Sequence, residues 1–94
     1  MSELDGTWNV ERVSGLLPPL LGVRKRIDGP GGRTTVGPIR APFAVVGREL
    51  RYTGLFTGFV DVLEPAGDGW TGRALYRERE YGRFRLTARR AEPR

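Results

Sequence analysis

The chain contains no cysteine and no histidine, and these two absences exclude much of the chemistry that a small protein can perform. Without cysteine it has no disulfide and no thiolate metal site, and without histidine it has neither an imidazole base nor the usual zinc ligand. Ser2 and Ser14 are the only serines, and the chain has no histidine that could activate either of them as a nucleophile. We therefore expect a protein that is not an enzyme, with no catalytic residue, no metal and no cofactor.

Long apolar runs are also absent. No stretch approaches the roughly 20 apolar residues that a membrane-spanning helix needs, and Met1 to Asp5 have neither the basic nor the apolar region of a secretion signal. We therefore expect a cytoplasmic protein with no membrane span. A chain of 94 residues suits one domain, 1–94. Its polar end, residues 90–94, is expected to be disordered.

Glycine and proline leave little room for helices. The 14 glycines and 7 prolines interrupt the chain so often that residues 83–92 are the longest stretch free of both. That stretch is shorter than the average helix of about 11–12 residues. The intervening runs are rich in valine, threonine and aromatic residues, which favour strands. Eight strands are predicted: residues 6–13, 23–28, 33–36, 42–46, 49–53, 57–63, 70–77 and 81–89.

The connections between these strands read as tight turns. Asp28 to Gly32, Gly47 and Ala66 to Gly69 carry the glycines and aspartates that tolerate the positive φ of hairpin turns. Successive hairpins form a meander, and many short strands in a meander favour closure. The predicted fold is all-β: a small antiparallel up-and-down β-barrel of about eight short strands, with little or no helix.

Alternation along the strands assigns side chains to the inside of this barrel. In the first strand Trp8 and Val10 share a face with Arg12, while the neighbouring polar residues take the other face. Such inward-facing residues either fill the barrel or line a small cavity, because an eight-stranded interior is barely wider than its own side chains. The other strands contribute Leu50, Tyr52, Trp70, Ala74, Tyr76, Phe84 and Leu86 to this inward-facing set.

Two cations fall on inward-facing positions, Arg12 in the first strand and Lys25 in the second. A buried cation without a partner is costly. Each of these must therefore lie near a mouth, pair with a carboxylate such as Asp61, or bind an anionic group of a ligand. An exposed strand end or an error of register is the alternative explanation.

An apolar loop separates the first two strands. Residues 16–21 read Leu-Leu-Pro-Pro-Leu-Leu, and the two adjacent prolines exclude both a helix and an interior strand. The leucines, among them Leu17 and Leu20, need an apolar partner. Three remain open: a plug packed over one barrel end, a lid over a ligand mouth, and a contact with another subunit.

The formal net charge of +5 and the sequence pI near 10.7 raise the question of a polyanionic partner. All but one of the 16 basic residues are arginine. Acidic residues are interspersed among them, as where Glu78 and Glu80 alternate with Arg77 and Arg79. Since a nucleic-acid-binding surface needs a basic stripe without this dilution, we expect no nucleic-acid partner.

The stretch Leu4–Val10, which contains Gly6 and Trp8, resembles the opening of the calycins, the superfamily of lipocalins and fatty-acid-binding proteins. The resemblance implies that the tryptophan packs at the closed end of the barrel. It also implies that an arginine of the last strand, Arg83 or Arg85, lies across the indole. Fatty-acid-binding members use interior arginines to receive the anionic group of their ligand.

Two functions follow as alternatives. The first is a calycin-like binding module for a small apolar or weakly anionic ligand. The second is a non-enzymatic interaction protein with a filled barrel, which forms a homodimer or binds another chain through the loop 16–21 and the strand Phe59 to Leu63. An enclosed void larger than a few water molecules favours the first, and a packed interior beside a broad exposed apolar patch favours the second. The predicted ligand-binding residues are Arg12, Lys25, Tyr52, Trp70, Tyr76, Leu17 and Leu20.

Overall fold

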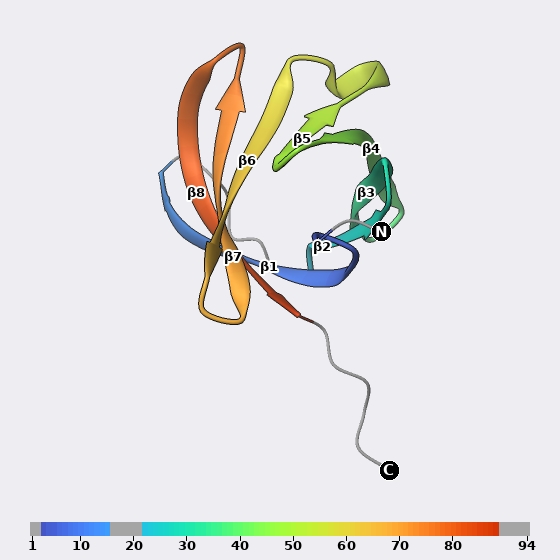
Figure 1. Cartoon of the computed structure of the whole chain (residues 1–94). Coiled ribbons are helices and arrows are strands. Elements are labelled where there is room, and N and C mark those ends of the chain that lie inside the picture. Colours follow the sequence, from blue (N-terminus) through green and yellow to red (C-terminus); the bar gives the residue numbers. More distant parts are fainter. Residues whose placement is uncertain (1–2, 16–21, 89–94) are drawn as a thin grey trace.

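A computed structural model describes residues 3–15 and 22–88, which form one closed antiparallel barrel of eight strands (Figure 1). One short 3₁₀ helix, η1 (Gly54–Phe56), precedes the sixth strand, and the described residues contain no α-helix. The all-β barrel prediction is therefore confirmed. The predicted loop 16–21, with Leu17 and Leu20, and the tail 90–94 lie outside the described residues. The strands are β1 (Gly6–Gly15), β2 (Arg24–Asp28), β3 (Gly31–Val36), β4 (Ile39–Val46), β5 (Glu49–Tyr52), β6 (Phe59–Ala66), β7 (Gly69–Tyr76) and β8 (Arg79–Ala88).

The barrel closes because β1 pairs on both of its sides. Trp8 lies opposite Lys25 of β2 and opposite Ala88 of β8. Every other strand pairs with its neighbours in the sequence, so the described strands close into a barrel. The pairing of β1 is uneven. Its residues pair with β2 only from Gly6 to Asn9, whereas they pair with β8 as far as Gly15. Past Val10, the described pairing of β1 is therefore with β8.

Two glycines make room for aromatic rings inside the barrel. Gly32 of β3 lies opposite Phe43 of β4, and Gly72 of β7 lies opposite Phe84 of β8. A Cβ atom at either glycine would overlap the ring of its partner. Each ring therefore packs directly on the backbone of the neighbouring strand. This also explains why β3 begins at Gly31, two residues before the predicted start, in a run with little intrinsic strand propensity.

One part of the interior is fully packed. Leu4, which precedes β1, has no exposed surface, and its carbonyl oxygen accepts a 2.8 Å hydrogen bond from Nε1 of Trp8. Gly6 between them has a φ of +137°, a conformation that favours glycine. The residues packed around them include Ile27, Phe43, Leu50, Leu63, Trp70 and Leu86. No helix among the described residues is both long and apolar enough to cross a membrane.

Candidate functional site

The rest of the interior holds a cavity of about 290 Å³. Ligand pockets of proteins span about 300–1,000 Å³, so this cavity lies at the small end of that range. A cavity of about 10–15 Å³ by the same kind of measure holds one water molecule, so this space exceeds a few waters, and it is partly open to the surface. All eight strands contribute to the wall, which is lined by the apolar or aromatic residues Val10, Val23, Ala41, Phe56, Phe59, Ala74, Tyr81 and Phe84 and by the polar residues Lys25, Thr34, Tyr52 and Asp61.

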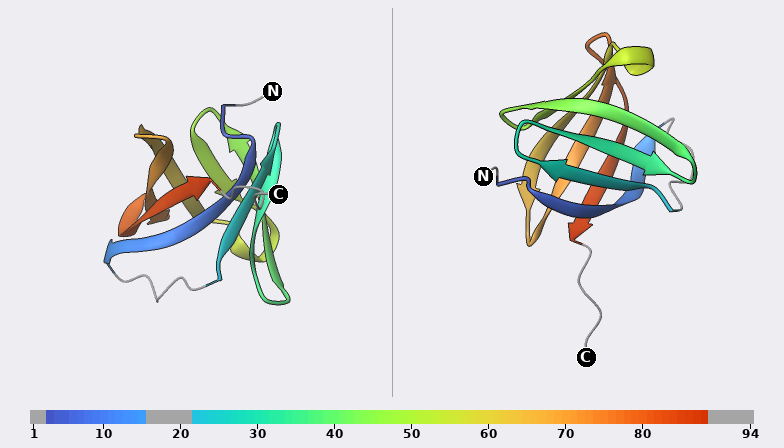
Figure 2. Two further views of the ribbon diagram at one scale, coloured as in Figure 1. Left: turned by 90° about the horizontal axis from the view of Figure 1, so that it is seen from below. Right: turned by 90° about the vertical axis from the view of Figure 1, so that its right-hand side faces the viewer.

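The cavity lies toward the end of the barrel where β1 finishes and where β2, β6 and β8 begin. Val23 directly precedes β2, Phe59 is the first residue of β6, and Tyr81 lies near the start of β8. In Figure 2 the end of β1 and the turn between β3 and β4 lie on the side away from the N-terminus. The packed end with Leu4 and the cavity thus occupy different parts of one barrel. Residues 16–21 join β1 to β2 but are outside the described residues, so the lid, the plug and the subunit contact stay predictions.

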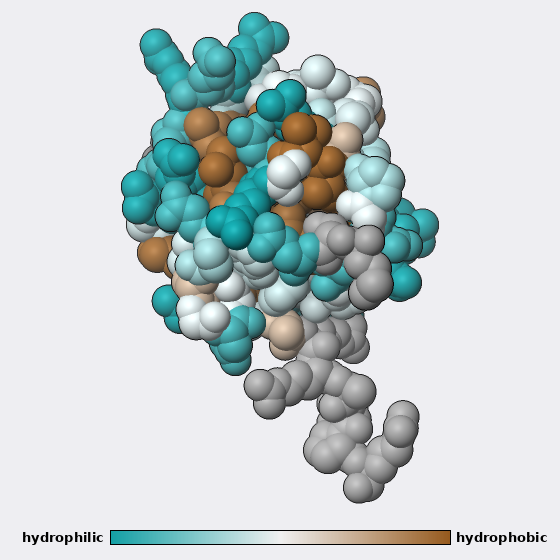
Figure 3. All heavy atoms as spheres, in the orientation of Figure 1, coloured by the Kyte–Doolittle hydropathy of each residue, from teal (hydrophilic) through white to brown (hydrophobic). Residues whose placement is uncertain are grey.

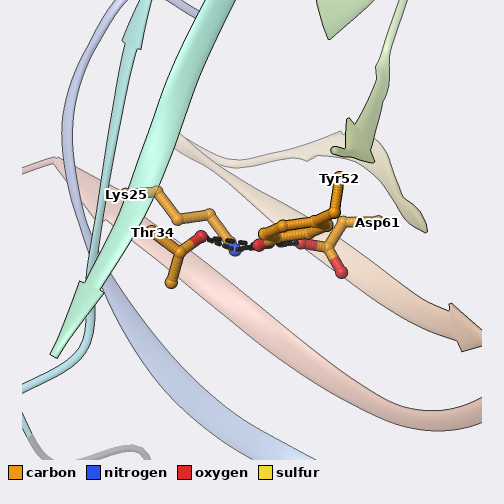
Figure 4. A network of polar contacts seen from close by, with 4 residues as sticks. All are labelled: Lys25, Thr34, Tyr52 and Asp61. Carbon is orange, nitrogen blue, oxygen red and sulfur yellow. Dashed lines mark hydrogen bonds and ion pairs between the residues drawn. The ribbon is translucent and has the colours of Figure 1, made fainter. Parts of the chain in front are cut away.

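Four polar side chains meet in the cavity wall (Figure 4). The ammonium nitrogen of Lys25 donates to Oγ1 of Thr34 at 2.7 Å and to the hydroxyl of Tyr52 at 2.6 Å. It forms an ion pair with Oδ2 of Asp61 at 2.9 Å. The Tyr52 hydroxyl donates to the same Oδ2 at 3.0 Å. Because that uses the only proton of Tyr52, the hydrogen bond between Thr34 and Tyr52 carries the threonine proton.

The strand register explains how these four residues meet. Lys25 of β2 and Thr34 of β3 are direct cross-strand partners. On the other side of the cavity, Asp61 of β6 lies opposite Leu50 of β5, and Tyr52 shares the face of Leu50 because it is two residues further along the same strand. Lys25 therefore spans the interior from one pair of strands to the other.

The lysine and the aspartate form a deeply buried ion pair. Lys25 is 4% exposed and Asp61 is 5% exposed. Lys25 lies inside, as the alternation predicted, and of the alternatives left open for it the structure shows the pairing with Asp61. Lys25 is also the only lysine of the chain, since the other 15 of the 16 basic residues are arginines. The aromatic rings of Tyr52 and Phe84 lie with their centroids 5.3 Å from its ammonium nitrogen, a distance that favours a cation.

The cluster keeps its lysine and its tyrosine protonated. Burial by itself would lower the pKa of Lys25, but the Asp61 carboxylate and the Tyr52 hydroxyl outweigh it, so the pKa of Lys25 is raised. Burial raises the pKa of Tyr52 to about 12, against the opposing effect of Lys25. Burial also raises the pKa of Tyr81. With its pKa raised, Lys25 stays an ammonium ion that donates to the surrounding oxygens.

Three residues predicted to bind a ligand lie elsewhere. Arg12 is exposed and donates to the carbonyl oxygen of Gly15 at 2.7 Å. At this point β1 no longer pairs with β2, which leaves Arg12 exposed. Trp70 is buried in the packed part, and the guanidinium of Arg48 lies 5.4 Å from its ring centroid. Tyr76 is 40% exposed, beyond an irregularity between β7 and β8.

The arginine predicted to cover Trp8 is absent from that position among the described residues. Arg83 and Arg85 alternate with the inward-facing Phe84, so both point outward and are exposed. Nε of Arg83 instead forms an ion pair with Glu80 at 3.1 Å. The prediction that Arg83 or Arg85 lies across the Trp8 indole is therefore wrong, because both side chains lie on the outer face of β8.

Several residues that line the cavity were not predicted from the sequence, above all Thr34. Its short strand gives no clear alternation, because β3 begins with two glycines. Phe56 was missed because it belongs to η1, in a stretch predicted as a connection. The signal that could have drawn attention to the site is the lone lysine among the arginines. Lysine carries a compact charge on a flexible stem, a different donor from the planar guanidinium.

Comparisons with models of protein families, with curated proteins and with solved structures find no match to this chain. The fold is therefore described by its topology alone, a closed antiparallel barrel of eight strands. Among the described residues, no group of three or more aspartates and glutamates is placed to hold a metal ion.

Proposed function

We propose that this barrel is a calycin-like binding module that takes a small, largely apolar molecule into its interior. The observation that carries the proposal is the cavity of about 290 Å³, whose walls are mostly apolar and which contains one compact polar cluster. Pockets for small molecules have this composition, since apolar walls supply affinity and a few polar groups orient the ligand. The likeness of Gly6 and Trp8 to the calycin opening supports the same reading. A cytoplasmic location is part of this proposal.

The interaction alternative has less support. It needs a filled barrel beside a broad apolar surface, whereas the interior is hollow toward one end. Figure 3 shows the face of the barrel seen in Figure 1, where groups of hydrophobic atoms are separated by a band of hydrophilic ones. On the outer face of β6, Val60 and Val62 are already half-buried. Among the described residues, Leu55 is 97% exposed, and Val36 and Ile39 form an exposed cross-strand pair next to the turn between β3 and β4. Exposed apolar groups of this size are normal in monomers.

Binding of naphthalene by calorimetry tests the proposal. Benzene fits an engineered apolar cavity of about 150 Å³, so a two-ring compound is a reasonable size for this one. Ala41 of β4 lines the cavity and is 8% exposed, so Ala41→Phe should fill it. We expect the native protein to bind naphthalene and Ala41→Phe to lose at least about tenfold in affinity, about 1.4 kcal/mol.

The matched control is Ala44→Phe, which places the same ring on the same strand but on its other face. This variant should bind naphthalene as the native protein does. Thermal melts should show that Ala41→Phe still folds, because overpacking a core costs about 1–3 kcal/mol. Equal binding by all three proteins, or by none, would contradict the proposed function.

A further inference from the structure

The polar cluster leaves one carboxylate oxygen of Asp61 without a hydrogen bond. Lys25 and Tyr52 both engage Oδ2, and no interaction is drawn to the other oxygen, Oδ1, in Figure 4. No side-chain oxygen or nitrogen among the described residues is both fully buried and unpaired. Oδ1 therefore keeps accessible surface although Asp61 is 5% exposed. Since Asp61 lines the cavity, that surface is available to a bound molecule.

The hydrogen-bond donors of the same cluster are all used. The ammonium group of Lys25 has three protons and three oxygens within 2.9 Å, those of Thr34, Tyr52 and Asp61. Tyr52 donates its proton to Asp61, and Thr34 donates to Tyr52. The cluster thus has an acceptor to offer but no spare donor. An acceptor group on a ligand would have to displace one of these internal bonds.

The charges in the cavity also cancel. The ammonium of Lys25 and the carboxylate of Asp61 are 2.9 Å apart, so the cavity holds no net charge to attract an ion. An anionic ligand would lose its hydration, find no spare donor in the cluster, and lie close to a carboxylate. The hydroxyl of Tyr81, which also lines the cavity, is the remaining donor there. A neutral ligand with one donor would avoid all three costs.

We propose, on the basis of the proposed function, that the molecule bound in the cavity is neutral and donates a hydrogen bond from a hydroxyl or N–H group to Oδ1 of Asp61. The apolar body of the ligand packs against the aromatic walls, which include Phe56, Phe59 and Phe84. This selects apolar alcohols, phenols and N–H heterocycles over carboxylates. The weakly anionic ligand considered from the sequence is thereby disfavoured.

Three compounds with one naphthalene body test this inference by calorimetry near neutral pH. They are 2-naphthol, a neutral donor; 2-methoxynaphthalene, in which the donor is methylated; and 2-naphthoate, an anion. We expect 2-naphthol to bind at least about tenfold more tightly than 2-methoxynaphthalene, because a hydrogen bond to a charged group has a net effect of this size or larger. We expect 2-naphthoate to bind most weakly of the three.

The possible outcomes separate this inference from the proposed function. If 2-naphthoate binds as tightly as 2-naphthol, or methylation has no effect, the inference is overturned while the binding function stands. If none of the three compounds binds, the proposed function itself is overturned, and the inference falls with it.

The double variant Lys25→Met with Asp61→Leu tests which group receives the ligand. Replacing a buried ion pair by apolar residues of similar size often preserves stability, and Tyr52 and Thr34 keep their mutual hydrogen bond. In this variant 2-naphthol and 2-methoxynaphthalene should bind within about threefold of each other, since the expected tenfold advantage depends on Asp61. A tenfold preference that persists in the folded variant would show that another group accepts the hydrogen bond. If the variant does not fold, the ligand series on the native protein still decides the matter.

Discussion

Replacing Asp61 alone should cost far more stability than replacing Asp61 and Lys25 together. The two side chains are 7% and 4% exposed and lie 2.9 Å apart, so either single change leaves a buried charge without its counterion. Breaking a buried pair in this way costs about 3–5 kcal/mol, whereas exchange of both partners for apolar residues is often neutral or stabilising. We therefore expect Asp61→Leu and Lys25→Met each to lose about 3–5 kcal/mol, and the double variant to lose less than either.

Urea unfolding of the four proteins measures this coupling, because the single and double changes close a double-mutant cycle. The exposed ion pair of Arg83 and Glu80, at 57% and 36% exposure, gives the matched control, and its coupling should be below about 1 kcal/mol. Losses in the buried pair that simply add would refute the reasoning, because they would show that the two charges do not stabilise each other. Losses below about 1 kcal/mol in both single variants would show that water reaches the cluster.

The remaining predictions concern pH and packing. The pKa of Tyr52 is raised to about 12, above its ordinary value near 10, so the folded state holds its proton where the unfolded state has lost it. The free energy of unfolding should therefore fall as the pH rises from about 10 to about 12. In Tyr52→Phe, equilibrium unfolding over the same pH range should show a shallower fall. An equally steep fall in this variant would contradict the role of Tyr52. Gly72→Ala should lower stability by about 1–3 kcal/mol, since its methyl group would overlap the Phe84 ring. Gly31→Ala, where a Cβ meets only a carbonyl oxygen at 3.5 Å, should change the melting temperature much less; equal shifts would contradict the packing argument.

The positions of the strands could be predicted from the sequence because glycine and proline mark the turns so regularly. All eight predicted strands are present, and the sequential meander correctly indicated a closed barrel. The predicted hairpin between β7 and β8 turns earlier than expected, at Arg77 and Glu78, which adopt positive φ values of 49° and 73°. Neither residue type favours this conformation, so composition gave no signal for a two-residue turn there.

Part of the candidate site could be predicted from the sequence, namely the residues whose inward position follows from side-chain alternation along a strand and whose charge requires a buried partner. Lys25 was predicted inside because of its place in an alternating strand, and Asp61 was named as a partner because a buried cation needs one. The same alternation placed Arg12 inside, and that prediction was wrong because β1 extends past the end of its pairing with β2. The difference in length between β1 and its paired stretch depends on the strand register of the barrel, which alternation along a single strand does not reveal. Thr34 was missed for a related reason, since its role depends on lying opposite Lys25.

A nuclear magnetic resonance titration of the native protein with 2-naphthol tests the central claim most directly. The account predicts that chemical shifts change mainly in the methyl groups of Val10, Val23, Ala41 and Ala74, which line the cavity. The exposed methyl groups of Val46, at 48% exposure on β4, should shift little. Shifts that fall mainly on such outer methyl groups, or no saturable shift at all, would contradict a ligand site inside this barrel.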